Sequence, residues 1–454
     1  MIPTEFLERM KALLGDEFAD FKAALEKSAE RGYRINTLKC DIADFSDSAC
    51  MPSEPLGYVK GGFRLLSDSR GIGNSPTHHS GRIYIQDPGA MASSAAINIK
   101  EGMWVADLCA APGGKSTELA ARLAGTGFIL SNEYVPKRAK ILVGNFERMG
   151  IRNGIVTSLD TSELARLFPF AFDAVVADAP CSGEGMLRKD VPAAEEWSVE
   201  NIAKCKERQA YILDNAAKMV RGGGSLLYST CTYSLEENEM TVDEFLIRHP
   251  DFELIAVSDD IAAASSDGIQ FAGAVTKDLH FSRRFYPHKS KGEGQFIALM
   301  RRRGDEYEFP SFKSCEALPT KEEKAAVLDF FKENLKKIPE GRIAKVGNNL
   351  VLISHGCPIP PRSVFSAGVL LGELRGRTFI PSHQFFSCYG DLFIRQENIT
   401  DEALALKYIR GEEIPATFGG SGFCSVLYRS SPLGGGKASS GMIKNHYPKG
   451  LRNN

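Results

Sequence analysis

The segment 105–117 reads Val105-Ala-Asp-Leu-Cys-Ala-Ala-Pro-Gly-Gly-Lys-Ser-Thr117, in which a pair of glycines joins a short apolar strand to a helix. Strand-like and helical stretches alternate around it, from about residue 84 to residue 300. The expected strands are 104–108, 127–132, 154–157, 174–177, 225–229 and 295–300, and the expected helices include 115–124, 135–149 and 199–220. Such alternation predicts a mostly parallel sheet with helices on both faces. The fold class is therefore α/β, with a Rossmann-like central sheet.

The composition is that of an ordinary soluble protein, with 43% hydrophobic and 25% charged residues in a chain of 454. No apolar run approaches the ~20 residues that span a bilayer, and the charged N-terminus lacks the apolar region of a secretory signal. The ten cysteines form no CxxC pair, which argues against a disulfide framework or a zinc ribbon. We expect a cytoplasmic monomer that needs no metal and no membrane.

The chain is expected to hold four modules. Residues 5–29 read as one or two amphipathic helices before a strand, which predicts a small α+β module at 1–65. The central domain is expected at 66–303. Beyond it the alternation stops, and 304–384 reads as a connecting α/β region with a hairpin turning at Gly347. Residues 385–454 are rich in Gly, Ser and aromatics, which predicts a β-rich module.

The formal net charge of −2 does not indicate a nucleic-acid partner, but the charges are unevenly placed. Residues 281–303 hold seven Lys or Arg against the single carboxylate Glu293, and after Glu413 there are five Lys or Arg and no acid. Basic tracts with interleaved aromatics suit phosphate contacts and base stacking. A charge run alone is more often a solvated face, so the case for RNA depends on the other motifs.

The glycine pair Gly113-Gly114 before Lys115 invites comparison with a phosphate-binding P-loop. That motif needs a glycine five residues before Gly114, where this chain has Cys109. Pro112 also stiffens the middle of the loop. The sequence therefore argues against an NTPase and favours an S-adenosylmethionine loop, in which amides at a helix N-terminus face the ligand.

Three acids follow the next strands. Glu133 stands about 20 residues past the loop and is placed to accept hydrogen bonds from ribose hydroxyls. Asp160 follows the third strand and is placed to hold the adenine amino group, and Asp178 ends the fourth. A single acid near a strand end is more often a surface or cap residue. Four consecutive strand ends that carry the loop and three acids predict a cofactor site.

Two cysteines stand just after strand-like runs. Cys181 lies in Ala-Pro-Cys-Ser-Gly, and Cys231 lies in Ser-Thr-Cys-Thr-Tyr. Free cysteines are usually buried small hydrophobes, but Pro, Ser and Thr at strand ends favour reactive thiols, which we expect adjacent helix N-termini to activate. The run Ser-Leu-Glu-Glu at 234–237 reads as a capping box that starts such a helix.

Two thiols beside a methyl-donor loop suit covalent chemistry on a pyrimidine. Carbon 5 of cytosine is too electron-poor to attack a methyl sulfonium, but a thiolate added at carbon 6 makes carbon 5 nucleophilic. After methyl transfer the carbon-5 proton must leave and the thiol must be eliminated, which needs a second polar group. A carboxylic acid on the base edge would promote the addition. Asp178, Cys181 and Cys231 supply this set.

Five stretches together resemble the Sun family of RNA cytosine-5 methyltransferases. They are Tyr84-Ile-Gln-Asp, Asp107-Leu-Cys-Ala-Ala-Pro-Gly-Gly-Lys, Asp178-Ala-Pro-Cys-Ser-Gly-Glu-Gly-Met, Ser229-Thr-Cys-Thr-Tyr and Arg284-Phe-Tyr-Pro-His. The resemblance implies an S-adenosylmethionine-dependent methyltransferase with Cys231 as the nucleophile and Cys181 as the release thiol. It implies cofactor contacts at Cys109, Ala110, Ala111, Pro112, Gly113, Gly114, Lys115, Glu133, Asp160 and Asp178.

The flanking segments add to this resemblance. The run Arg-Ile-Asn-Thr-Leu-Lys at 34–39 is similar to the N-terminal domain of such proteins, and the tail from Pro432 is similar to their PUA-like module. The resemblance therefore implies RNA-binding modules at 1–65 and 385–454. It also implies an RNA partner, with small-subunit ribosomal RNA or the ribosomal subunit favoured.

Three alternatives stay open at this point. The same chemistry would serve transfer RNA. DNA cytosine-5 methyltransferases use a Pro-Cys thiol, which would make Cys181 the nucleophile and Cys231 structural, but they place the cofactor loop differently. A non-catalytic RNA-binding protein is the third alternative, and it would leave the paired thiols and the series of acids without a role.

Overall fold

The computed structural model describes residues 2–46, 51–66, 71–189, 195, 197–304, 312 and 314–453. Its centre is a ten-stranded sheet. In chain order its strands are β5 (Trp104–Asp107), β6 (Phe128–Asn132), β7 (Gly154–Thr157), β8 (Phe172–Asp178), β9 (Val220–Thr230), β10 (Phe252–Ile255), β11 (Ser266–Asp267), β12 (Arg283–Phe285), β13 (Gln295–Arg302) and β16 (Val364–Ala367). Their order across the sheet is β11-β12-β13-β9-β8-β5-β6-β7-β16, and β10 also pairs with β13.

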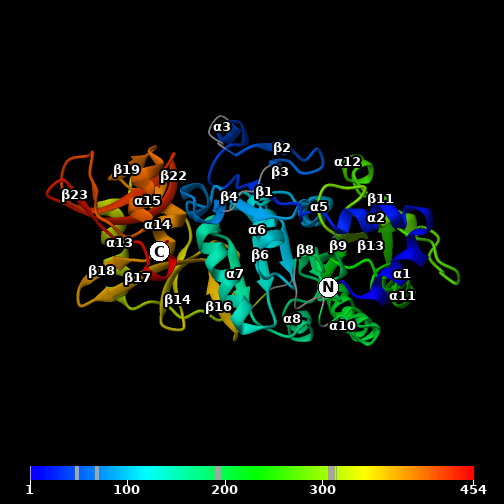
Figure 1. Cartoon of the computed structure of the whole chain (residues 1–454). Coiled ribbons are helices and arrows are strands. Elements are labelled where there is room, and N and C mark those ends of the chain that lie inside the picture. Colours follow the sequence, from blue (N-terminus) through cyan, green and yellow to red (C-terminus); the bar gives the residue numbers. More distant parts are fainter. Residues whose placement is uncertain are drawn as a thin grey trace.

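Strands β9, β8, β5, β6 and β7 run parallel, and β13 and β16 join them antiparallel. Helices cover both faces, as the alternation predicts (Figure 1). One face carries α5 (Pro88–Ala96), α6 (Gly114–Arg122) and α7 (Pro136–Met149), and the other carries α8 (Thr161–Leu167), α10 (Val199–Ala217) and α11 (Glu239–Arg248). Because parallel strands end at one edge, the loops after β5 to β9 gather there.

The N-terminal part begins with two helices and a small sheet. Its elements are α1 (Thr4–Leu14), α2 (Phe18–Leu25), β1 (Gly32–Ile35), α3 (Ile42–Ser46), β2 (Ser53–Pro55), β3 (Gly62–Leu65), α4 (Pro76–His79) and β4 (Ile83–Gln86). The expectation of one or two amphipathic helices at 5–29 is confirmed, with two present. The sheet order is β2-β3-β1-β4, and β4 pairs antiparallel with β1. This sheet therefore continues to Gln86, beyond the boundary expected at residue 65.

The C-terminal part contains two further sheets. The first is β14 (Arg342–Val346), β15 (Asn349–Ile353), β17 (Val369–Arg375) and β18 (Thr378–Pro381), with α13 (Lys321–Asn334) and α14 (His383–Tyr389). The second is β19 (Gln396–Ile399), β20 (Ile414–Pro415), β21 (Gly422–Tyr428), β22 (Ser431–Ser439) and β23 (Met442–Asn445), with α15 (Glu402–Ile409). The hairpin predicted at Gly347 is confirmed, because Val346 pairs with Asn349.

The expected boundaries of the connecting region do not coincide with the packing. The strand β16, from the expected segment 304–384, pairs with β7 at the edge of the central sheet. The helix α14 lies across the expected boundary at 384/385, and its Phe385 and Phe386 share a core with Phe330 and Phe331 of α13. Packing against a neighbour, rather than composition, decides where these elements belong.

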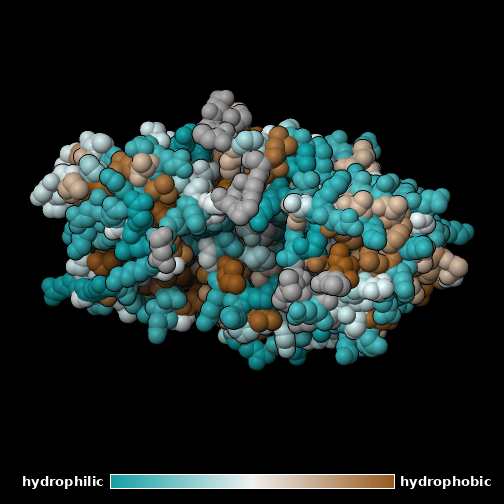
Figure 2. Space-filling view, viewed as in Figure 1, coloured by the Kyte–Doolittle hydropathy of each residue, from teal (hydrophilic) through white to brown (hydrophobic). Residues whose placement is uncertain are grey.

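The C-terminal part packs on the N-terminal part and on α7 (Figure 1). His79 Nδ1 lies 2.7 Å from the Tyr447 hydroxyl, and Arg82 Nη1 donates to Ser431 Oγ at 2.8 Å. Figure 2 shows a face that is mostly hydrophilic, with small separate hydrophobic patches. Within the described ranges, the helices are all too short or too polar to cross a bilayer.

Candidate active site

The loop between β5 and α6 lines a cavity of about 260 Å³. Gly113 has a φ of +117°, a conformation that favours glycine, and a Cβ on it would lie 2.9 Å from Leu142 Cδ1. The cavity is lined by Tyr84, Ile85, Gln86, Ala90, Asp107, Cys109, Ala110, Ala111, Pro112, Gly114, Lys115 and Asp178. Most of the predicted cofactor residues therefore meet around one hollow at the carboxyl edge of the sheet.

Asp107 and Gln86 are among the five residues of this lining that the sequence prediction of the site did not include. Asp107 is fully buried, and its Oδ2 accepts a hydrogen bond from Ser116 Oγ at 2.6 Å. Among the described residues, Asp107 Oδ1 and Gln86 Oε1 have no hydrogen-bond partner. Burial raises the pKa of Asp107 to about 7. The rule that picked out acids at strand ends applies equally to Asp107, the last residue of β5.

Glu133 stands at the end of β6, as predicted, but outside the lining of this cavity. Its carboxylate is nearly buried and is held on both sides. Glu133 Oε1 accepts from the Val135 amide at 2.9 Å, and Glu133 Oε2 lies 3.1 Å from Arg138 Nη1. The carboxylate is therefore fixed in position at the start of α7.

Asp160 stands after β7, where it caps α8. Its Oδ1 accepts from the Ser162 amide at 2.9 Å, from Ser162 Oγ at 2.6 Å and from the Tyr211 hydroxyl at 2.7 Å. Burial alone would raise the pKa of Asp160, but these hydrogen bonds outweigh it and the pKa is lowered. Asp160 is thus a helix cap in this structure, also outside the cavity lining.

Lys115 and Asp178 form an ion pair across the cavity. Lys115 Nζ lies 2.8 Å from Asp178 Oδ2, and Asp178 Oδ1 accepts from Ser229 Oγ at 2.7 Å. Burial lowers the pKa of Lys115, but the charge of Asp178 more than offsets this and the pKa is raised. The pair joins the cofactor loop to the strand end that precedes Cys181.

The two cysteine sulfurs lie 3.3 Å apart. Cys181 follows β8, and Cys231 follows β9, its parallel neighbour in the sheet. The hydrogen bond to Cys231 and the burial of the site raise the pKa of Cys181 well above its ordinary value. A hydrogen bond therefore joins the two cysteines, and Cys181 resists losing its proton.

The predicted activation by helix N-termini is wrong for Cys181. A single 3-10 turn, Glu184–Met186, follows Cys181. The pKa of the Cys181 thiol is raised, whereas activation would lower it. The capping box predicted at 234–237 is also only half formed. Ser234 Oγ accepts from the Glu237 amide at 3.3 Å, but the Glu237 side chain points to Ser182 and Gln209. The helix α11 begins later, at Glu239.

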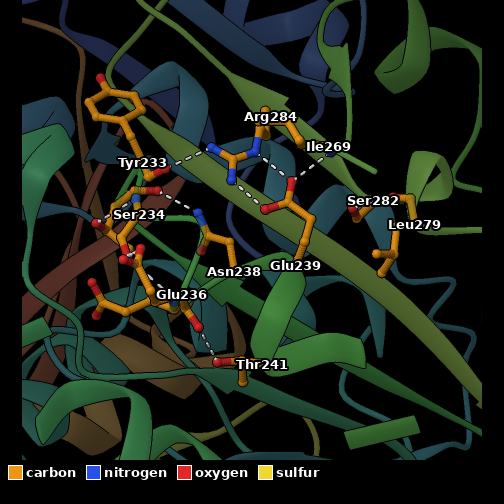
Figure 3. Close-up of polar contacts among 12 residues, drawn as sticks. Tyr233, Ser234, Glu236, Asn238, Glu239, Thr241, Ile269, Leu279, Ser282 and Arg284 are labelled. Atoms are coloured by element: carbon orange, nitrogen blue, oxygen red, sulfur yellow. Dashed lines mark hydrogen bonds and ion pairs between the residues drawn. The ribbon is translucent and has the colours of Figure 1, made fainter. Parts of the chain in front are cut away.

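A buried ion pair anchors the turn that follows Cys231 (Figure 3). Arg284 of β12 binds both carboxylate oxygens of Glu239, and their side chains are 2% and 0% exposed. Arg284 Nη1 also donates to the Tyr233 carbonyl at 2.8 Å, and Asn238 Nδ2 donates to the Thr232 carbonyl at 3.0 Å. Buried side chains therefore fix the Thr232 and Tyr233 carbonyl groups by hydrogen bonds.

Most cations of the basic tract 281–303 are less free to bind phosphate than its composition suggests. Most of its cations pair with acids elsewhere in the chain. The ion pairs are Arg283–Asp267, Arg284–Glu239, Lys289–Glu17, Lys291–Glu54, Arg302–Asp251 and Arg303–Glu253. Arg283 and Arg284 are buried, so their pairs belong to the interior, whereas Lys289, Lys291 and Arg303 pair at the surface.

The tail aromatics are also less available than the sequence suggests. Tyr428 and Tyr447 are each 3% exposed, so they cannot stack on a base. Phe423 is partly exposed on β21, and Lys437 Nζ lies 5.6 Å from the centre of its ring. Lys437 pairs in register with both Phe423 and Lys444, which places the three side chains together on one face of the sheet.

Three family models match successive parts of the chain. The model described as 16S rRNA methyltransferase RsmB/F matches residues 94–301. The N-terminal domain of 16S rRNA methyltransferase RsmF matches residues 2–88, and the methyltransferase RsmF PUA domain matches residues 398–453.

Curated relatives match over nearly the whole chain. Ribosomal RNA small subunit methyltransferase F of Klebsiella pneumoniae is 31% identical, over 99% of this chain and 96% of its own length. The protein of that name from Aeromonas salmonicida is 29% identical, over 99% and 97%.

Solved structures show the same central fold. A methyltransferase homologue protein from Pyrococcus horikoshii has a TM-score of 0.59 and 28% identity, covering 66% of this chain and 95% of its own. The chain therefore belongs to the RsmB/F family of 16S rRNA methyltransferases and is an RNA methyltransferase.

Proposed function

We propose that the chain transfers the methyl group of S-adenosylmethionine to carbon 5 of a cytosine in small-subunit ribosomal RNA. Cys231 is the nucleophile in this proposal, and Cys181 is the release thiol. The observation that carries the proposal is the 3.3 Å separation of the two sulfurs, at neighbouring strand ends beside the cofactor-loop cavity. Both thiols and the loop come from one chain, so a monomer suffices. A ribosomal RNA substrate places the activity in the cytoplasm.

The cavity offers what S-adenosylmethionine needs. This cofactor carries an ammonium group, ribose hydroxyls and an adenine amino group, all of which are hydrogen-bond donors. Asp107 Oδ1 and Gln86 Oε1 are buried acceptors without a partner among the described residues, and buried polar groups are usually satisfied. We assign these acceptors, with the loop Cys109–Lys115, to the cofactor. Glu133 is assigned to the ribose, and Asp160 to the adenine through its second carboxylate oxygen.

In the proposed reaction the thiolate of Cys231 forms a bond to carbon 6 of the cytosine, and ring electrons move toward carbon 5. Carbon 5 would then bond to the methyl group as the bond from methyl to the sulfonium sulfur breaks and S-adenosylhomocysteine leaves, which is the chemistry that bound S-adenosylmethionine supplies. Loss of the carbon-5 proton re-forms the double bond and expels Cys231 as a thiolate. Asp178, held by Lys115 and Ser229, is placed to hydrogen-bond the base edge and promote the addition.

The thiol pair explains how Cys181 takes part. The largest cause of its raised pKa is the hydrogen bond to Cys231. Once Cys231 is bonded to carbon 6, that cause is gone, so the pKa of Cys181 falls and loss of its proton to solvent becomes easier, while burial still opposes it. The resulting thiolate accepts the carbon-5 proton, and the re-formed thiol then faces the departing thiolate of Cys231.

The test is methylation with a labelled donor on 16S rRNA, transfer RNA and DNA. We expect label on carbon 5 of a cytosine in ribosomal RNA. Cys231→Ala should abolish it while S-adenosylmethionine binding, measured by calorimetry, is unchanged. Label on transfer RNA or DNA instead would overturn the substrate assignment. Substantial turnover by Cys231→Ala would overturn the assignment of the nucleophile.

A further inference from the structure

The two cysteine loops hold each other through two buried carboxylates. Glu184 lies three residues after Cys181, and its Oε2 reaches across to the other loop. There it accepts from Thr232 Oγ1 at 2.9 Å and from the Tyr233 amide at 3.0 Å. The loop that follows Cys181 thus holds the turn that follows Cys231.

Glu237 makes the reverse connection. It follows Cys231, and it accepts from both the amide of Ser182, at 2.9 Å, and the Ser182 hydroxyl. The Ser182 and Thr232 hydroxyls also lie 2.9 Å apart, between the two carboxylates. We call the set of Ser182, Glu184, Thr232 and Glu237 the carboxylate brace.

The brace is buried and its carboxylates are well satisfied. Glu184 and Glu237 are 2% and 0% exposed. Each receives a further donor, from Trp197 Nε1 at 3.0 Å and from Gln209 Nε2 at 2.9 Å respectively. Burial raises the pKa of both carboxyls. Buried charge is costly and seldom improves stability over apolar packing, whereas a satisfied polar network specifies one arrangement.

The brace acts one residue away from the reacting sulfurs. Ser182 follows Cys181 directly, and Thr232 follows Cys231 directly, so the brace fixes the backbone beside each thiol. The Gly185 amide also donates to the Cys231 carbonyl at 2.8 Å. Arg284 and Asn238 hold the Tyr233 and Thr232 carbonyls of the same turn (Figure 3).

We infer that Glu184 and Glu237 are positioning residues that set the separation of the two thiols required for release of the methylated base. The inference rests on the proposed roles of Cys231 and Cys181. Proton transfer and elimination at one ring need both sulfurs at a defined spacing, whereas methyl transfer needs only Cys231. Loss of either carboxylate should therefore harm release more than methyl transfer.

The first measurement uses the protein without RNA. Diamide accepts two hydrogen atoms and converts two neighbouring thiols to a disulfide. The Cys181–Cys231 disulfide should form more slowly in Glu184→Ala and Glu237→Ala than in the wild type. We expect a slowing on the order of 10- to 100-fold, since a misplacement of about 1 Å can cost about 100-fold. Glu184→Gln and Glu237→Gln keep the shape and one acceptor, so they should recover most of the rate.

The second measurement uses ribosomal RNA and the cofactor. In the alanine variants the ratio of denaturation-resistant protein–RNA adduct to released product should rise by at least about tenfold, and the glutamine variants should lie in between. If Cys231→Ala still methylates RNA, the proposed function fails. The diamide result tests the brace independently of that outcome.

The control is Asp173→Asn. Asp173 is a buried carboxylate on β8, but it lies at the opposite end of the strand, where its Oδ2 accepts from the Trp104 amide at 2.7 Å. Its loss should lower stability without changing the disulfide rate or the adduct ratio. If an alanine variant does not fold, Ser182→Ala removes one hydroxyl of the brace for the same comparison. Folded brace variants within twofold of the wild type in both measurements would overturn the inference.

Discussion

On the cysteine side of the site, Glu184 accepts hydrogen bonds from the loop of Cys231, and Glu237 accepts from the loop of Cys181. On the cofactor side, Asp107 Oδ1 and Gln86 Oε1 have no hydrogen-bond partner in the part of the chain that the structure describes. The cysteine side is therefore assembled before any ligand arrives. The cofactor side keeps acceptors for a ligand to satisfy. Substitutions on the first side should change how catalysis proceeds, and those on the second should change how tightly the cofactor binds.

The largest effect is expected on the cysteine side. Cys181→Ala should let Cys231 add to the ring and accept the methyl group, but not let it leave. The product should be a protein–RNA adduct on denaturing gels that needs both Cys231 and the cofactor, since the target base must leave its stack to enter the site. Turnover should fall nearly to zero. The double variant should form no adduct, and an adduct only in Cys231→Ala would exchange the two roles.

The next effect concerns Asp107, whose pKa burial raises to about 7. Its unfolded-state pKa is about 3.9. The folded protein therefore keeps a proton that the unfolded chain releases, so stability falls as pH rises from about 4 to about 7 and then levels off. The loss is about 1.4 kcal/mol per pH unit within this window, or up to about 4 kcal/mol in total.

Asp107→Asn cannot ionise. Its free energy of unfolding relative to the wild type, measured by urea denaturation without cofactor, should rise across this pH window and stay constant above it. The same variant should bind S-adenosylmethionine more weakly. A constant difference in stability across the window would show that Asp107 is not protonated in the folded protein.

The next prediction concerns cofactor binding by Glu133, which lies on the cofactor side but outside the cavity lining. Glu133→Ala removes a charged acceptor, an effect on the order of 1.5–3 kcal/mol. The S-adenosylmethionine Kd measured by calorimetry should then rise about 10- to 100-fold. Glu133→Gln should fall between the alanine variant and the wild type. An unchanged Kd in both would assign the ribose to another group.

Local pattern and strand order predict much of this site. The glycine loop, Asp178 and the two cysteines could be placed because parallel strands end at one edge of a sheet. Glu133 and Asp160 stand at the same edge, but outside the cavity lining. The full capping box predicted at 234–237 does not form, because the Glu237 side chain accepts instead from Ser182, which lies 55 positions away in the chain. A four-residue pattern carries no information about such a partner.

The basic tracts show the same limit for charge. Arg284 reads as part of a phosphate-binding run, yet it is 2% exposed and pairs with Glu239, 45 positions away in the chain. Tyr428 and Tyr447 read as stacking residues, yet they belong to the core of the terminal sheet. Composition gives the number of charges and rings, and only the packing decides which of them face solvent.

The smallest effect is expected on the terminal sheet, far from the chemistry. Phe423, Lys437 and Lys444 share a face there, and both lysines are exposed. We predict that Lys437→Ala with Lys444→Ala lowers RNA affinity and reduces the slope of log affinity against log salt by about 1.4, as expected for two lost contacts to single-stranded phosphates.

Removal of the whole module is a poorer test, because Phe385 and Phe386 of α14 belong to a core shared with α13. Lys407→Ala on α15, an exposed lysine of the same module, is the matched control. A filter-binding titration over a range of salt should leave that control unchanged. An equal loss of slope per lysine in both variants would mean that the module attracts RNA only through its overall charge.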